Sequence, residues 1–153
     1  SLPAGNANLL EATKHKRLLG FDFGLKQIGV ASGQTLTSSA TGLTILKAVD
    51  GIPKWDQVEK LLKEWHPDLV VVGLPLNMDD SESDLSNRAR KFARRLQGRF
   101  AVEVEMVDER LTSREAKAIG RDQGTQDLTK IDHIAASLIL QSWLDTPSIG
   151  CAP

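Results

Sequence analysis

The sequence has little that would support disulfide, thiol or histidine chemistry. Cys151 is the only cysteine among the 153 residues, so no disulfide can form within the chain. None of the three histidines falls at a spacing typical of metal ligands, and no serine or cysteine stands in an arrangement typical of a nucleophile. Any catalytic chemistry is therefore expected to come from other residue types.

Long apolar runs are also lacking. No run approaches the roughly 20 residues that a membrane-spanning helix requires. Residues 1–16 contain no apolar stretch of the secretory type, and their Gly, Asn and Ala content predicts a flexible tail. Together with the single cysteine, these absences predict a cytoplasmic protein without a membrane partner.

An excess of charge of one sign is missing overall, but the charges are unevenly distributed. The formal net charge is −1, which by itself predicts no polyanionic partner. Residues 85–99 nevertheless contain six basic side chains and no acidic one, and a helical period places Arg88, Lys91, Arg95 and Arg99 near one face. Such a stripe favours phosphate contacts that do not read sequence; a solvated helix face is the alternative. Without an aromatic platform beside it, base stacking is not expected.

Hydrophobic periodicity predicts a single α/β domain. Strands are expected at 18–23, around 28–30, at 42–46, at 69–73 and at 102–107, the last of these half-exposed. Helices are expected at 54–66, 85–97 (ending at Gly98), 112–120 and 131–144, with a loop at 121–130. Three strands precede any helix and strand–helix alternation follows, which favours a mixed sheet in which an antiparallel meander joins parallel crossovers, flanked by helices. The domain is expected to span 17–146, between tails at 1–16 and 147–153.

Asp22 is an unusual charge at the end of an apolar strand. Leu19, Phe21 and Phe23 alternate along this segment, and Gly24 begins a tight turn. A buried carboxylate is costly unless it is paired or holds a metal. Asp22 is therefore either a turn aspartate that accepts from the Gly24 amide or a carboxylate that handles a metal or a phosphate.

Other acids stand at the ends of expected elements. Asp108 and Glu109 follow the strand at 102–107, and Asp132 lies in the expected first turn of the last helix. Each has an ordinary explanation: solvated acids before a helix cap for the first two, and a favourable helix-dipole interaction for Asp132. A mixed sheet can bring strand ends and a helix start to one edge, where clustered carboxylates would need a cation such as Mg²⁺ or Mn²⁺.

Four ordered segments resemble the YqgF (RuvX) family of RNase H-like, resolvase-related nucleases. They are residues 22–31, 72–77, 108–112 and 130–136, and the similarity runs from about residue 18 to residue 144. The resemblance implies an RNase H-like fold with Asp22, Glu109 and Asp132 as an acidic triad. Asp108 is the adjacent acid and is an alternative or an addition to Glu109.

The resemblance also implies a function and partners. The family role is processing of the 5′ end of the small-subunit (16S) ribosomal RNA precursor, which would involve nucleic acid and a ribosomal particle. The alternatives are a Holliday junction resolvase-like DNA endonuclease, which would be expected to dimerise, and a nucleic-acid-binding protein without catalysis. The sequence leaves open whether the protein is a monomer or a homodimer.

A two-metal hydrolysis fits such a triad. Two Mg²⁺ or Mn²⁺ ions about 3.5–4 Å apart can activate water and stabilise the leaving oxygen. Asp22 is expected to bridge them, with Glu109 and Asp132 each completing one side. Lys26 and Arg110 are candidate phosphate contacts, with ordinary surface solvation as the alternative for both. The opening motif also resembles the phosphate loop of actin-like ATPases, but those proteins need two such domains and this chain has room for one.

Overall fold

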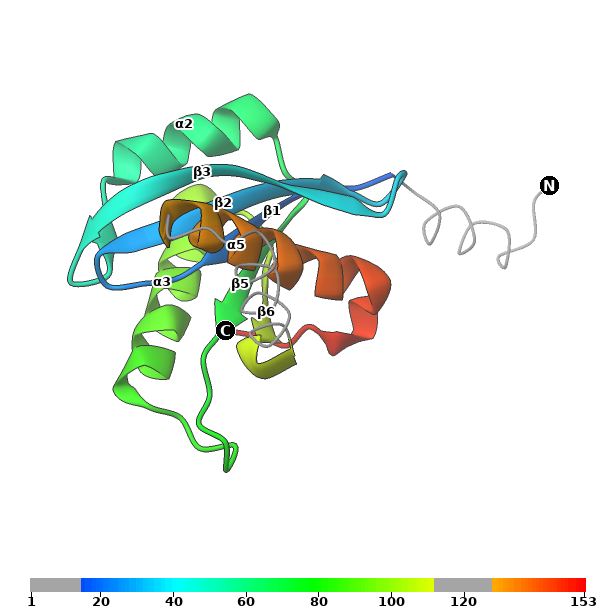
Figure 1. Ribbon diagram of the computed structural model, residues 1–153. Helices are drawn as coiled ribbons and strands as arrows, with labels where there is room; N and C mark the ends of the chain where they lie inside the picture. The colour runs from blue at the N-terminus through cyan, green and yellow to red at the C-terminus, as the bar shows by residue number, and fades with distance from the viewer. Residues whose placement is uncertain (1–14, 112–127) are drawn as a thin grey trace.

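The computed structural model describes residues 15–111 and 128–153, with side chains described for 15–111 and 134–153. Figure 1 shows helices packed against a single sheet. The strands are β1 (Arg17–Asp22), β2 (Gln27–Gln34), β3 (Ser39–Val49), β4 (Ile52–Pro53), β5 (Leu69–Leu74) and β6 (Val104–Asp108). The α-helices are α2 (Trp55–Trp65), α3 (Asp84–Phe100) and α5 (Leu128–Asp145), and the 3₁₀ turns are η1 (Glu109–Leu111) and η2 (Pro147–Ile149).

The sheet is mixed, as predicted. Its strand order is β4-β3-β2-β1-β5-β6. The pairs β1–β2, β2–β3 and β3–β4 are antiparallel, whereas β1–β5 and β5–β6 are parallel. The antiparallel meander therefore joins the parallel part at β1, the strand that ends at Asp22.

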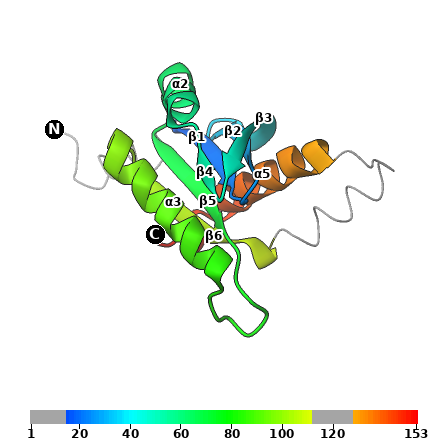
Figure 2. The same cartoon turned by 90° about the vertical axis from the view of Figure 1, so that its left-hand side faces the viewer.

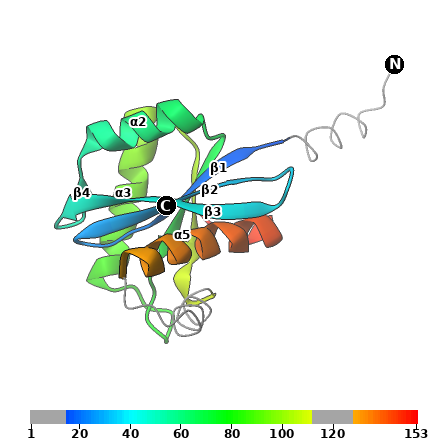
Figure 3. The ribbon, with the colours of Figure 1, turned by 45° about the horizontal axis from the view of Figure 1, so that its top comes forward.

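Helices cover both faces of the sheet. Phe92, Ala93 and Leu96 of α3 and Val58 of α2 pack on one face, and Figure 3 shows α5 on the other. Successive side chains of a strand point to opposite faces. Accordingly, Leu18 packs on the α5 side, while Leu19 and Phe21 pack on the side of α2 and α3. All six residues of β5 are buried, which is the pattern of a strand covered by helices on both faces.

Several element boundaries differ from the predictions. Strands β2 and β3 are longer than expected, and the short β4 was not expected. Helix α3 continues through Gly98 to Phe100 and ends where Ala101 adopts a left-handed φ of 53°. The prediction of a stop at Gly98 was wrong because Phe100 adds one more apolar position, packing against Trp55 with ring centroids 6.3 Å apart. Strand β6 begins at Val104, and Val107 is buried against α5 rather than half-exposed.

The chain after η1 was only partly as expected. Helix α5 begins at Leu128, so residues 128–130 are helical and not part of a loop. The helix predicted at 112–120, and the rest of the loop at 121–127, lie outside the described residues. Within residues 147–153, Cys151 extends the sheet edge by exchanging backbone hydrogen bonds of 2.7 and 2.9 Å with Met106. In the described ranges, no helix has the length and apolar character to cross a membrane.

Candidate active site

Asp22 lies at the carboxyl end of β1 and faces α5. It shares its sheet face with Gly20, two residues earlier, and with Leu18, four residues earlier. A β-carbon at position 20 would lie 3.0 Å from Leu140 Cβ and 3.2 Å from the Ala136 carbonyl oxygen. Glycine at this position therefore lets α5 lie close against β1. Helix α5 thereby covers the end of the strand that carries Asp22.

Glu109 reaches the same place from the end of β6. A β-carbon at position 73 in β5 would lie 2.9 Å from Glu109 Cγ and Oε1 and 2.6 Å from Ile139 Cδ1. Glycine at this position thus leaves room for the Glu109 side chain over β5, beside α5. Phe21 pairs with Val72 in the parallel register, so one residue further Asp22 and Gly73 lie side by side. The sequence indicated Gly73 only as the end of the strand at 69–73; a glycine that ends an apolar run is the signal that could have pointed to this close approach.

The two half-buried carboxyl groups are hydrogen-bonded to each other. Burial raises the pKa of Asp22, partly offset by the hydrogen bond from Glu109. Burial, the bond to Asp22 and the nearby charges of Asp22 and Asp108 raise the pKa of Glu109 to about 9. At neutral pH the protonated Glu109 carboxyl therefore donates to the Asp22 carboxylate. A cation would replace this proton, because two adjacent carboxylates cannot both be ionised without compensation.

The Asp108 carboxylate pairs with Arg110. Arg110 Nη2 lies 2.6 Å from Asp108 Oδ2, and Arg110 Nε lies 3.0 Å from both carboxylate oxygens. These bonds hold the pKa of Asp108 below its usual range. Of the two adjacent acids, Glu109 is the one that meets Asp22.

Arg110 connects the strand end to the loop that follows β5. Its Nη1 lies 2.7 Å from Asp80 Oδ1 and donates to the Asn77 carbonyl at 3.0 Å. Figure 2 shows this loop projecting beyond the sheet beneath α3. Arg110 is thus fully engaged by protein groups, and its role as a phosphate contact stays a prediction.

Asp132 belongs to α5, but its side chain lies outside the described residues. Because α5 begins at Leu128, Asp132 is the fifth residue of the helix and not in its first turn as expected. This weakens the explanation by the helix dipole, whose influence is strongest in the first turn.

The side chains at this sheet edge fit a hard divalent cation. Carboxylate oxygens are the preferred ligands of Mg²⁺ and Mn²⁺, and Asp22 and Glu109 present them in a partly enclosed position. Within 15–111 and 134–153, no three His, Cys, Asp or Glu side chains gather into a metal-binding group. A cation held by this pair would therefore take its further ligands from elsewhere.

The basic residues predicted to bind nucleic acid separate into different environments. Lys26 is exposed in the turn after β1. Arg88, Lys91 and Arg95 line one cavity on the face of the sheet that α3 covers. Arg99 stacks over Trp55, with Cζ 4.5 Å from the ring centroid. The stripe is also less free of acids than the sequence indicated, since Arg88 Nε pairs with Asp84 Oδ2 at 2.9 Å.

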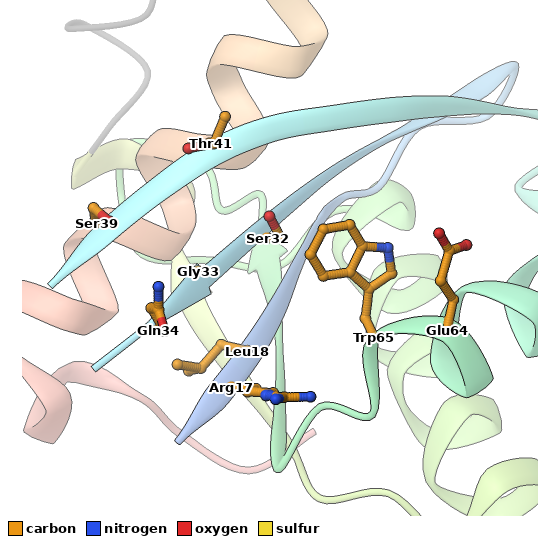
Figure 4. Close-up of a pocket in the computed structure, with 9 residues that line it drawn as sticks. All are labelled: Arg17, Leu18, Ser32, Gly33, Gln34, Ser39, Thr41, Glu64 and Trp65. Carbon is orange, nitrogen blue, oxygen red and sulfur yellow. The ribbon is translucent and has the colours of Figure 1, made fainter. Parts of the chain in front are cut away.

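A further cavity of about 400 Å³ lies far from the acid pair. Trp65 at the end of α2 and Arg17 at the start of β1 flank it, and polar side chains of β2 and β3 complete it (Figure 4). Arg17 begins the strand that Asp22 ends. This cavity is therefore at the opposite end of β1 and is not part of the acid site.

Solved structures with a similar fold include resolvases. Fowlpox virus resolvase in complex with Holliday junction DNA aligns with a TM-score of 0.53 at 14% identity, covering 86% of this chain and 98% of that one. RuvC from T. thermophilus in complex with its Holliday junction substrate aligns with a TM-score of 0.52 at 16% identity, covering 87% of this chain and 96% of that one. At such low identity the similarity concerns the fold alone, and it confirms the RNase H-like resolvase architecture.

Sequence relatives are much closer. A Shewanella denitrificans protein named "Putative pre-16S rRNA nuclease" is 55% identical over 87% of this chain and 96% of its own length. A Pseudomonas fluorescens protein of the same name is 58% identical over 84% of this chain and 91% of its own length. The model of the family described as "RuvX: Holliday junction resolvase" matches residues 16–146. The chain therefore belongs to the RuvX family.

Proposed function

We propose that this RuvX-family nuclease hydrolyses phosphodiester bonds at the Asp22–Glu109 pair with a divalent cation, and that its substrate is the precursor of 16S ribosomal RNA. The observation that carries the proposal is the hydrogen-bonded pair of half-buried carboxyl groups with raised pKa values at the end of the central strands. Perturbed carboxyl groups of this kind concentrate at functional sites.

Asp132 is the proposed third ligand. It precedes Ala136 by four residues, so the two positions lie on the same face of α5. The Ala136 carbonyl lies beside Gly20, two residues before Asp22 on the same face of β1. This arrangement supports placing the Asp132 position one helical turn further along, towards the acid pair.

The roles of the residues follow from their positions. Bound Mg²⁺ or Mn²⁺ would activate water and stabilise the negative charge that develops on the phosphate. Asp22, at the end of β1 and facing α5, would be one ligand of the cation, while Glu109 would release its proton when the cation binds. Lys26, exposed in the turn just beyond Asp22, is the proposed contact to a phosphate near the scissile bond.

The names of the relatives support the RNA substrate. At 55–58% identity over more than four-fifths of the chain, those relatives are named for pre-16S rRNA. Processing of its 5′ end in the cytoplasm, on a ribosomal particle, is part of the proposal. A branched DNA substrate is the second candidate, supported by the description of the family and by the junction complexes of fold neighbours. That reading favours a homodimer, while the RNA reading is compatible with a monomer.

The test compares two substrates and two proteins. Wild type and Asp22→Asn are incubated with Mn²⁺ and either a labelled pre-16S leader fragment or a four-way DNA junction. We expect wild type to cut the RNA and the variant to lose at least about 100-fold in rate, the scale of losing a major electrostatic contribution. Preferential cutting of the junction would favour the second candidate. Equal rates for both proteins would contradict the assignment of the site, and tight RNA binding without cleavage by wild type would indicate a non-catalytic protein.

A further inference from the structure

We propose that the cavity between α3 and the turn joining β3 to β4 binds a backbone phosphate of the substrate, on the sheet face opposite to the acid pair. The proposal rests on the proposed function only in taking the ligand to be nucleic acid. It deepens that function by extending the substrate contact around the edge of the sheet.

The cavity lies next to the acid site along the chain but across the sheet from it. It has a volume of about 360 Å³, and its aromatic floor includes Phe23 and Phe92, whose ring centroids are 5.4 Å apart. Phe23 follows Asp22 directly, yet it packs with the α3 side while Asp22 faces α5. A nucleic-acid strand leaving the acid pair would reach the cavity by passing the turn that carries Lys26.

One wall of the cavity is fixed in place. Gly51 has a φ of +80°, and a β-carbon there would lie 2.6 Å from Phe23 Cζ, so this turn can approach the floor only with glycine. The Gly51 amide donates to the Leu25 carbonyl at 2.8 Å, which ties this turn to the one after β1. Arg88 Nη1 donates to the Asp50 carbonyl at 3.2 Å, which ties it to α3. The cavity is thus held open by specific contacts.

Two of the three cations that line the cavity are available to a ligand. Arg88 forms an ion pair with Asp84 and donates a hydrogen bond to the Asp50 carbonyl in the cavity wall. Lys91 and Arg95 are four residues apart, on one face of α3, and neither forms an ion pair or hydrogen bond with any residue the structure describes. The acids that line the cavity are Asp84, compensated by Arg88, and Asp50 on the turn.

The remaining basic residues of α3 are unlike this pair. Arg90 pairs with Glu82 and donates to the Ala152 and Pro153 carbonyls, while Arg99 lies over Trp55. Arg94 is exposed but does not line the cavity. The stripe seen in the sequence therefore reduces to one built site, where two adjacent cations fit a single phosphodiester without reading its base.

The test measures binding apart from cleavage. An Asp22→Asn protein is titrated against the labelled pre-16S leader at several salt concentrations, alone and with Lys91→Gln plus Arg95→Gln. We expect the double change to raise the Kd about tenfold and to reduce the slope of log K against log salt by about 0.7, the value for one single-strand phosphate. Arg94→Gln, which removes a neighbouring charge outside the cavity, is the matched control and should change both quantities much less.

Equal effects of the double change and of Arg94→Gln would overturn the proposal, because the charge of the helix and not the cavity would then be responsible. Absence of any RNA binding by the Asp22→Asn protein would overturn it as well. Failure of the wild type to cut RNA would contradict the proposed nuclease site but leave this binding comparison intact, so the two failures are distinguishable.

Discussion

Two neighbouring carboxyl groups tolerate each other at the end of β1 because they share one proton. Asp22 and Glu109 share a proton in a partly buried position, and Gly73 provides the room. The sequence marked Asp22 and the Asp108–Glu109 pair as acids at strand ends but left open which of the two neighbouring acids joins Asp22, and in the structure Glu109 is the one that meets it. It could not predict that the Glu109 side chain needs glycine at position 73, because this requirement arises only when β5, β6 and α5 are packed together.

The raised pKa of Glu109 predicts how stability depends on pH in metal-free protein. The pKa rises from 4.5 to about 9 on folding, so the folded state binds this proton more tightly than the unfolded state. The stabilisation is fully present below pH 4.5 and is lost as the pH rises through 9. We expect the Tm measured by circular dichroism in a chelating buffer to fall over this range. The Tm of the Glu109→Gln variant should fall less over the same pH range. An equally steep fall in that variant would show that other groups are responsible.

Replacing Gly73 by alanine should damage the site more than the fold. The added β-carbon would lie within 3 Å of Glu109 Cγ and of Ile139 Cδ1, so one of these side chains must move. We expect a loss of about 1–3 kcal/mol in the free energy of unfolding and a larger proportional loss of RNA cleavage. Gly98→Ala is the matched control: nothing lies within 4 Å of its β-carbon, and a gain of about 0.5–1 kcal/mol is expected in the helix. Full cleavage by Gly73→Ala would contradict the placement of Glu109.

At the scale of elements, local signals predicted helix α2 well and α3 less well. Lys54 and His66 flank α2 as its caps, and Pro67 follows at once. Helix α3 continues past Gly98 because the contact between Phe100 and Trp55 outweighs the helix-propensity penalty of glycine, which is about 1 kcal/mol. The tertiary contact that decides this boundary involves Trp55, more than 40 residues away in the sequence, and no local pattern reports it.

Arg110 joins β6 to the loop after β5, and its removal should loosen both. Arg110→Gln leaves Asp108 without its guanidinium and releases Asp80 and the Asn77 carbonyl. Leaving a partly buried carboxylate unpaired predicts a loss of about 1–3 kcal/mol in chemical denaturation. Hydrogen exchange should increase in residues 77–81. Lys63→Gln, which breaks the exposed pair with Glu59, should cost less than 1 kcal/mol and serves as the control. Similar losses in both variants would contradict the anchoring role.

At the scale of the whole molecule, the mixed sheet brings distant segments together. The meander, the parallel strands and α5 converge at the carboxyl end of β1, so acids separated by more than 80 residues in the sequence become neighbours. The order of strands and helices was enough to predict this convergence. The cavity beside α3 was not predictable, because it needs the turn at Asp50 and Gly51, where no functional motif stands out.

Whether the Asp22–Glu109 pair is a cation site can be measured as Mn²⁺ binding by isothermal titration calorimetry. Repeating the titration in buffers of different ionisation enthalpy counts the protons released. The account predicts saturable binding by wild type with proton release near neutral pH, and loss of this binding in Asp22→Asn. Glu103→Gln, which removes an exposed acid away from the site, should bind like wild type. Undiminished Mn²⁺ binding by Asp22→Asn would contradict the account.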